Sequence, residues 1–280
     1  LHHPLRRELV STIVANQVLN SQGSTYYSRL RTVSGASASA VVRAYRIARA
    51  ITRAADRWAD VEALGSSVDP ETSRIMLQDI DRLVTIVSRW YLRNPSERSI
   101  DEEIAATADD FERLSEGFPT LGLPEWRAPY ERAADEMREL GVPEALAVRH
   151  AYQLALRRGP DIVDLAHRYE QDIIRVAEIS TRASQEFLIG WLERQIRLLP
   201  GTTAFDRLAI ESLRDDLQQL RRDVVASILE GSDGSLDAFL STPDRVTPRV
   251  DRGYRWLSRA SILDGTAGLI ASKTLRQILL

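Results

Sequence analysis

Apolar residues recur every three or four positions along most of this chain. Met76, Ile80, Leu83, Val87 and Trp90 repeat at steps of four and three, which places them in one stripe along a helix. No segment combines the two-residue alternation of a strand with the turn residues of a β-hairpin. The pattern therefore predicts an all-α, multi-helix bundle-like domain.

Two long helices have clear ends. Asp69 before Pro70 supplies an N-cap and a proline at the first helical position, and Asn94-Pro95 ends that helix. The second carries apolar residues from Phe205 to Ile228, and Gly231 closes it. Further helices are expected at about 5–21, 24–33, 38–55, 100–115, 125–140, 143–157, 161–168, 171–198 and 250–280.

Glycine and proline indicate the domain organisation. They are densest over 231–248, which holds Gly231, Gly234, Pro243 and Pro248. We expect a helical domain over 1–230, with a candidate sub-boundary near 94–124. A linker over 231–248 and a loosely attached C-terminal helix over 249–280 would follow.

Composition narrows the class of protein. The chain is 280 residues long and 44% apolar, which is enough for a real core. It has no cysteine, which excludes disulfides, cysteine-ligated zinc and a thiol nucleophile. No apolar run is long enough to cross a bilayer, and the first residues do not form a signal peptide. We expect a cytoplasmic location, no membrane contact, and a fragment of a longer protein.

Charge is distributed unevenly. Residues 1–57 hold nine arginines and two acids, a local charge of +7, which leaves −10 for the remainder. Residues 96–145 hold fourteen acids against five arginines. The contrast fits internal complementarity, a partner surface or phosphate binding. Because Lys273 is the only lysine, the arginine richness is also what a GC-rich genome produces, so we do not take it as a sign of phosphate binding.

The sequence lacks the common catalytic motifs. It contains no dinucleotide-binding glycine turn, P-loop or nucleophile elbow, and its four histidines lack metal-ligand spacing. The acidic pairs Glu102-Glu103, Asp109-Asp110 and Asp215-Asp216 lie in expected helices, where neighbours point about 100° apart. We interpret them as solvated or capping charges. We predict no catalytic, cofactor-binding or metal-binding residue in this chain.

Two further features bear on contacts. Asn16 and Asn20 share an apolar stripe of the first helix, where they would cap neighbouring turns or make an inter-domain contact. The run Tyr26–Arg53 could imitate a DNA-binding helix-turn-helix, with Arg43, Arg46 and Arg53 on one face. Its turn is longer than the compact DNA-binding type and the chain is acidic, so DNA binding is the weaker reading.

Several short segments, spread over most of the chain, form a recognisable series. They include Leu1-His2-His3-Pro4-Leu5-Arg6-Arg7-Glu8, Ala15-Asn16-Gln17-Val18-Leu19-Asn20, Val42-Arg43-Ala44-Tyr45, Gly141-Val142-Pro143-Glu144-Ala145-Leu146-Ala147, Asp161-Ile162-Val163-Asp164-Leu165-Ala166 and Leu213-Arg214-Asp215-Asp216-Leu217. In number, order and spacing they resemble the large bacterial NAD-dependent glutamate dehydrogenases, in the stretch that follows their catalytic and nucleotide-binding region. The resemblance is weakest around 95–125 and after 230.

The resemblance implies an enzyme of amino-acid catabolism that deaminates L-glutamate oxidatively to 2-oxoglutarate and ammonia with NAD. It also implies a very long, self-assembling polypeptide whose catalytic lysines and NAD-binding turn lie upstream of this chain. The residues agree, because amino-acid dehydrogenation needs a lysine in a shaped cleft and NAD needs a strand, a glycine turn and a helix.

We therefore expect a non-catalytic C-terminal domain that braces the catalytic domain or the contacts of a homo-oligomer. It would bind no cofactor, nucleic acid or membrane itself. We predict inter-domain contacts at Arg6, Arg7, Asn16, Asn20 and Arg43. The alternative is a free-standing helical interaction protein or helix-turn-helix DNA-binding regulator.

Overall fold

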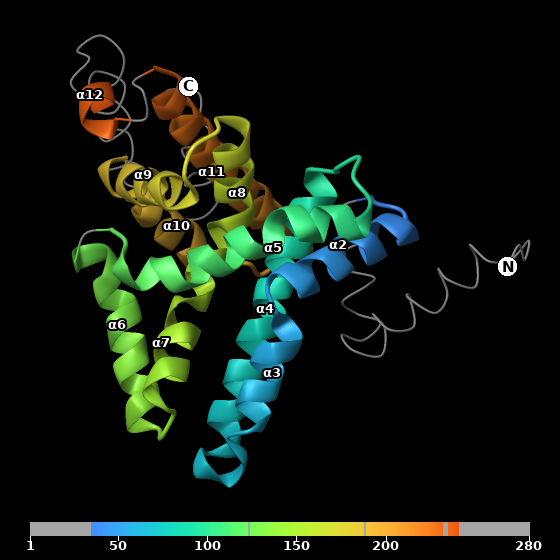
Figure 1. Cartoon of the computed structure of the whole chain (residues 1–280), viewed down its shortest axis with the longest axis vertical. Helices are drawn as coiled ribbons and strands as arrows, with labels where there is room; N and C mark the ends of the chain where they lie inside the picture. Colours follow the sequence, from blue (N-terminus) through green and yellow to red (C-terminus); the bar gives the residue numbers. More distant parts are fainter. Residues whose placement is uncertain (1–34, 123, 188, 232–234, 241–280) are drawn as a thin grey trace, which may run out of the picture. The chain divides into compact units, whose positions relative to one another are not determined.

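The computed structural model describes residues 35–122, 124–187, 189–231 and 235–240, and every regular element in these ranges is a helix (Figure 1). The all-α prediction is confirmed. The chain divides between Asp164 and Leu165 into two compact units, each treated by itself below. The candidate sub-boundary near 94–124 lies within the first unit, and the expected helix over 249–280 lies outside the described residues.

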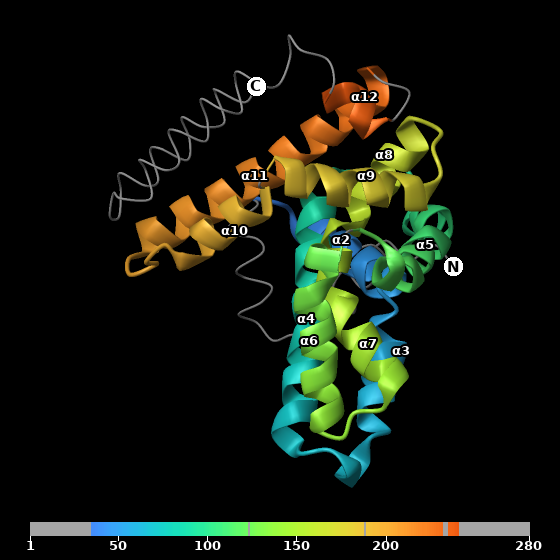
Figure 2. The same ribbon diagram turned by 90° about the vertical axis from the view of Figure 1, so that its left-hand side faces the viewer.

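The first unit is built around α2, α4 and α5. Helix α2 packs along α4 and α5, α3 packs on α4, and α7 packs on α6. Figures 1 and 2 show α3–α4 and α6–α7 as two antiparallel hairpins. The elements are α2 (Ala38–Ile51), α3 (Ala54–Glu62), η1 (Gly65–Ser67), α4 (Pro70–Arg93), α5 (Ile100–Gly117), η2 (Phe118–Thr120), α6 (Pro124–Glu139), α7 (Glu144–Gln153), η3 (Leu154–Arg158) and the first part of α8 (Gly159–Arg168).

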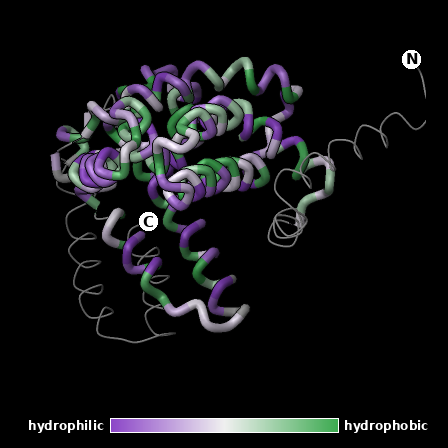
Figure 3. Tube along the Cα trace, turned by 90° about the horizontal axis from the view of Figure 1, so that it is seen from below, coloured by the Kyte–Doolittle hydropathy of each residue, from purple (hydrophilic) through white to green (hydrophobic). Residues whose placement is uncertain are grey.

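Helix α4 forms as the sequence predicts. The Asp69 side chain accepts a hydrogen bond from the backbone N–H of Glu71, Pro70 is the first helical residue, and Asn94 is the C-cap. The five stripe residues from Met76 to Trp90 are all buried. The capping box of α5 is also present, with Ser99 and Glu102 exchanging hydrogen bonds. The hydropathy colouring of Figure 3 shows polar and apolar residues alternating along the helices.

The expected helix over 38–55 is wrong at its C-terminal end. Helix α2 stops at Ile51, and the Thr52 hydroxyl donates a hydrogen bond to the Ala48 carbonyl at 2.7 Å. Arg53 then takes a left-handed conformation with φ 49°, which redirects the chain into α3. Helical periodicity continues across this break, so the pattern alone did not reveal it.

The second unit contains the other correction. The expected helix over 171–198 is two helices, because Asp172 caps the first and Phe187 ends it. The break lets the second helix pair with the stretch of α11 from Ile210 to Leu220. The elements are the rest of α8, α9 (Ile173–Glu186), α10 (Ile189–Leu198), α11 (Ala204–Gly231) and α12 (Leu236–Leu240). The last lies in the stretch expected to be a linker.

Candidate functional site

Helix α2 is basic on its outer face. It contains three arginines and no acid, and its apolar residues, such as Val41 and Ile47, are fully buried. This burial leaves Arg46 and Arg49 exposed on the opposite side. Within the described residues, α2 therefore presents two of the arginines of the N-terminal region to solvent.

Arg43, a predicted inter-domain residue, is half-buried and engages its own unit. Its Nη2 donates to the carbonyls of Ser96 and Arg98, at 3.2 and 2.5 Å, in the loop between α4 and α5. Arg6, Arg7, Asn16 and Asn20 lie outside the described residues. The predicted inter-domain contact therefore stays a prediction for all five.

Glu103, in the first turn of α5, contacts the same loop and corrects one interpretation. It is only 6% exposed, so it is not a solvated charge. Its carboxylate accepts a hydrogen bond from the Ser96 hydroxyl at 2.7 Å and lies 3.6 Å from Arg98. Its neighbour Glu102 is a capping residue, as predicted. Arg43 and Glu103 together fix the start of α5 relative to α2.

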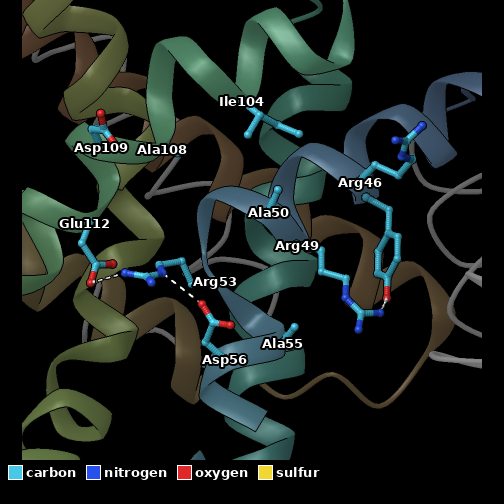
Figure 4. Close-up of a pocket in the computed structure, with 11 residues that line it drawn as sticks. Arg46, Arg49, Ala50, Arg53, Ala55, Asp56, Ile104, Ala108, Asp109 and Glu112 are labelled. Carbon is cyan, nitrogen blue, oxygen red and sulfur yellow. Dashed lines mark hydrogen bonds and ion pairs between the residues drawn. The ribbon is translucent and has the colours of Figure 1, made fainter. Parts of the chain in front are cut away.

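The break after α2 brings Arg53 between two acidic side chains. Its Nε lies 3.1 Å from an Asp56 carboxylate oxygen, and its Nη1 lies 3.0 Å from one of Glu112 on α5 (Figure 4). The hydrogen bond to Asp56 and the negative charges of Glu112 and Asp56 raise the pKa of Arg53. The structure thus shows internal complementarity between the basic region and the acidic middle of the chain.

Arg57 is a buried side chain that stabilises this break between α2 and α3. It is 5% exposed, and its Nε donates to the Thr52 carbonyl at 2.8 Å while Nη2 donates to the Ser115 hydroxyl at 2.9 Å. Burial, followed by the charge of Arg149, lowers the pKa of Arg57 to about 10. Arg57 therefore ties the end of α2 to α5 and fixes the direction of the Arg53 backbone.

A surface groove of about 1080 Å³ lies where α2, the start of α3 and α5 meet (Figure 4). Its basic side carries Arg46, Arg49 and Arg53, and its acidic side carries Asp109 and Glu112. The residues between them are small or apolar: Ala50, Ala55, Ile104 and Ala108. The groove can bind a mixed-charge surface, with carboxylates towards α2.

The sequence predicts an arginine face but not this groove. Arg43, Arg46 and Arg53 were expected on one face, whereas Arg43 contacts the α4–α5 loop and Arg49 lines the groove instead. Arg49 Nη1 donates to the Tyr45 hydroxyl at 3.3 Å. The spacing of Arg46, Arg49 and Arg53 was the available signal. Asp109 was not recognised, because its role depends on how α5 packs against α2.

Other candidate chemistry lies away from the groove. His150 is buried on α7 with Nε2 3.4 Å from an Asp79 carboxylate oxygen. Among the residues that the structure describes, no three or more His, Cys, Asp or Glu side chains are grouped so as to hold a metal ion. No helix within the same ranges is long and apolar enough to cross a membrane.

Comparison with known proteins identifies the family. The family model described as "Glutamate dehydrogenase, C-terminal" matches residues 1–277. The NAD-specific glutamate dehydrogenase of Halomonas elongata is 30% identical over 256 residues, which is 91% of this chain and 15% of that protein. Its counterpart from Pseudomonas aeruginosa is 31% identical over 245 residues, 83% of this chain and 14% of that protein.

The NAD-specific glutamate dehydrogenase of Mycobacterium tuberculosis is 27% identical over 288 residues, which covers 99% of this chain and 17% of that protein. The chain thus spans between 14% and 17% of the length of these curated relatives. Because the family model covers nearly every residue, the chain belongs to the family of glutamate dehydrogenase C-terminal domains.

Proposed function

We propose that this chain is the C-terminal helical domain of a long, cytoplasmic, NAD-dependent glutamate dehydrogenase. The whole enzyme would deaminate L-glutamate oxidatively to 2-oxoglutarate and ammonia, with NAD as the oxidant, in amino-acid catabolism. The observation that carries the proposal is the family match over residues 1–277, in a chain that spans about 15% of the named relatives. The catalytic domain would occupy part of the remaining length.

The chain itself would be non-catalytic and would bind no NAD. Amino-acid dehydrogenation needs a lysine in a desolvated cleft, and Lys273 is the only lysine. NAD binding needs a strand, a glycine turn and a helix. In residues 35–122, 124–187, 189–231 and 235–240 the regular elements are helices. Both observations support an active site elsewhere in the polypeptide.

Its role would be to brace the catalytic domain or the contacts between subunits of a homo-oligomer. We place the joint in residues 1–57, because they come first in the chain and carry a local charge of +7. Arg6, Arg7, Asn16 and Asn20 would contact the preceding domain directly. Arg43 would act by holding the α4–α5 loop beside α2.

Three proteins test this proposal: the full-length gene product, a version that lacks this chain, and a full-length double variant. The full polypeptide should be several times longer than 280 residues and should oxidise L-glutamate with NAD. Deletion of this chain should abolish assembly or activity, and the Arg6→Ala/Arg7→Ala variant should lower one of them, because arginine binds carboxylates bidentately. A gene product of about this length, or an isolated chain that oxidises glutamate, would overturn it.

A further inference from the structure

We propose that the groove between α2 and α5 docks an acidic amphipathic helix from the rest of the enzyme polypeptide. The proposal rests on the proposed function, because it needs a longer enzyme to supply that helix. The groove is lined on one side by Arg46, Arg49 and Arg53 and on the other by Asp109 and Glu112. These two sides would determine which kind of partner surface the C-terminal domain binds.

The spacing of the arginines fits a helical partner. Arg46 and Arg49 lie one turn apart on α2, and Arg53 follows just beyond the end of the helix. Three residues at helical rise cover about 4.5 Å, so Arg46 and Arg49 present two positive charges across one turn of α2. A helix with acids at every third or fourth position presents carboxylates at the same interval.

The guanidinium charges of Arg46 and Arg49 are not paired with acids among the described residues. Arg53 is paired with Asp56 and Glu112. Arg49 donates to the neutral hydroxyl of Tyr45, which orients its guanidinium without neutralising it. Arg46 has no hydrogen-bond or ion-pair partner among the described residues, and both Arg46 and Arg49 are exposed. Two positive charges, of which that of Arg49 is oriented, therefore remain for a partner.

The floor of the groove allows close approach. Ala50 and Ala108 are half-buried alanines on facing helices, with Ile104 beside them. Small residues between two helices leave room for the backbone of a third, and Ile104 offers apolar surface to it. The partner helix would therefore bury an apolar stripe here and direct its acids towards α2.

The acidic side of the groove excludes a uniformly negative partner. Asp109 is exposed and Glu112 half-buried, and both would repel the phosphates of a nucleic acid lying along the arginines. A helix can carry acids on one edge and basic or neutral residues on the other. The relatives are about six times as long as this chain, so most of such an enzyme lies outside it and can provide that helix.

The test is photo-crosslinking in the intact enzyme, with p-benzoylphenylalanine in place of Ala55 at the exposed rim of the groove. A probe in place of Arg132, an exposed residue of α6, is the matched control. We expect the Ala55 probe to label a segment outside these 280 residues that carries acids at helical spacing. Labelling confined to residues of this chain, to nucleic acid, or no higher than at the Arg132 site would overturn the proposal.

Charge reversal provides the second measurement. In the probe-bearing enzyme, Arg46→Glu/Arg49→Glu should lower the crosslinking yield by more than about tenfold, because like charges would then face each other. Arg46→Gln/Arg49→Gln should lower it less. The matched control Arg132→Glu/Arg194→Glu, at two exposed arginines elsewhere, should leave it unchanged. Lysines replacing the acids of the labelled segment should restore the yield in the Glu variant, and a failure to do so would contradict charge pairing.

The glutamate-dependent reduction of NAD by the same preparation separates the two proposals. If the intact enzyme is active and the groove captures nothing, only the docking proposal fails. If the gene product is no longer than this chain or has no such activity, the proposed function fails as well, because no catalytic region exists to supply the helix.

Discussion

The centre of the first unit and the α10–α11 hairpin of the second bury their apolar residues differently. In the first unit, Val41, Ile47 and Leu83 are 0% exposed, since α2 packs against both α4 and α5. In the hairpin, on which α9 also packs, the buried residues keep between 1% of their surface, at Ile189, and 7%, at Ile210 and Leu217. The core of the first unit is closed more completely, so the first unit should be the more stable.

Polar groups follow the same division. In the first unit the Trp90 Nε1–H donates to a buried Asp161 carboxylate oxygen at 2.7 Å. In the second unit, Arg182 Nη2 lies 2.7 Å from an Asp237 carboxylate oxygen, and the Asp237 side chain is 76% exposed. Buried hydrogen bonds cost more to break than exposed ion pairs. Variants at matched positions should reveal this difference.

The largest expected effect is at Phe111. This ring is 1% exposed and so close to α8 that a Cβ on Gly159 would lie 2.5 Å from it. Phe111→Ala should lower the free energy of unfolding of the first unit by about 3–5 kcal/mol. The control Phe187→Ala, at a partly buried ring in the second unit, should cost less.

Hydrogen exchange followed peptide by peptide measures each unit separately in these variants. We expect protection to fall in α4 and α5 for Phe111→Ala, and in α10 and α11 for Phe187→Ala. Equal losses at the two sites would contradict the proposed difference in packing.

Removing one buried donor should have an intermediate effect. Trp90→Phe keeps most of the ring but deprives the buried Asp161 carboxylate of its Nε1–H, which costs about 1–3 kcal/mol. Asp237→Asn, which removes one charge of the exposed Arg182–Asp237 pair in the second unit, should cost less than about 1 kcal/mol. Chemical denaturation of both variants provides the comparison, and a larger loss for Asp237→Asn would reverse our ranking.

Alkaline pH should destabilise the first unit through Tyr91. Burial raises the pKa of Tyr91, while its hydrogen bond to Thr107 lowers it by less. Above about pH 10 the unfolded chain loses this proton and the folded chain retains it, so stability falls as pH rises. Arg57, whose pKa burial lowers to about 10, acts in the opposite sense over the same range.

Tyr91→Phe should remove the tyrosine contribution while leaving that of Arg57. Denaturation midpoints measured from about pH 8 to pH 11 should therefore fall less steeply for this variant than for the parent chain. If Tyr91→Phe and the parent had parallel pH profiles, Tyr91 would not be the group responsible.

The smallest effect is expected in the groove. Arg46→Glu/Arg49→Glu changes two exposed charges, so the stability of the isolated chain should change by less than about 0.5 kcal/mol. Phe111→Ala, in contrast, should lower stability strongly, because Phe111 contributes to folding and the groove arginines should contribute only to binding. A thermal unfolding curve of the double variant, shifted as far as that of Phe111→Ala, would make these arginines structural.

The sequence predicted most helices because their signals are local. The α4 stripe from Met76 to Trp90 and the Ser99–Glu102 capping box each depend on residues only a few positions apart. The breaks at Arg53 and Phe187 were missed because tertiary packing causes them, through the Arg57 hydrogen bond to Thr52 and the pairing of α10 with α11.

The groove was predictable only on its basic side. The arginine spacing is visible in the sequence, but the facing acids come from a helix about sixty residues further on. Arg43 illustrates the same limit, since its partners are the carbonyls of Ser96 and Arg98. Backbone carbonyls carry no sequence signal, so only the fold reveals this contact.

Calorimetric titration of NAD tests the central claim most directly, using the intact enzyme and the isolated 280-residue chain side by side. Our account predicts that the intact enzyme binds NAD and that the isolated chain, shown to be helical by its far-UV circular dichroism, releases no binding heat. Binding of NAD by the isolated chain at micromolar concentration, or no binding by the intact enzyme, would contradict a non-catalytic C-terminal domain of an NAD-dependent glutamate dehydrogenase.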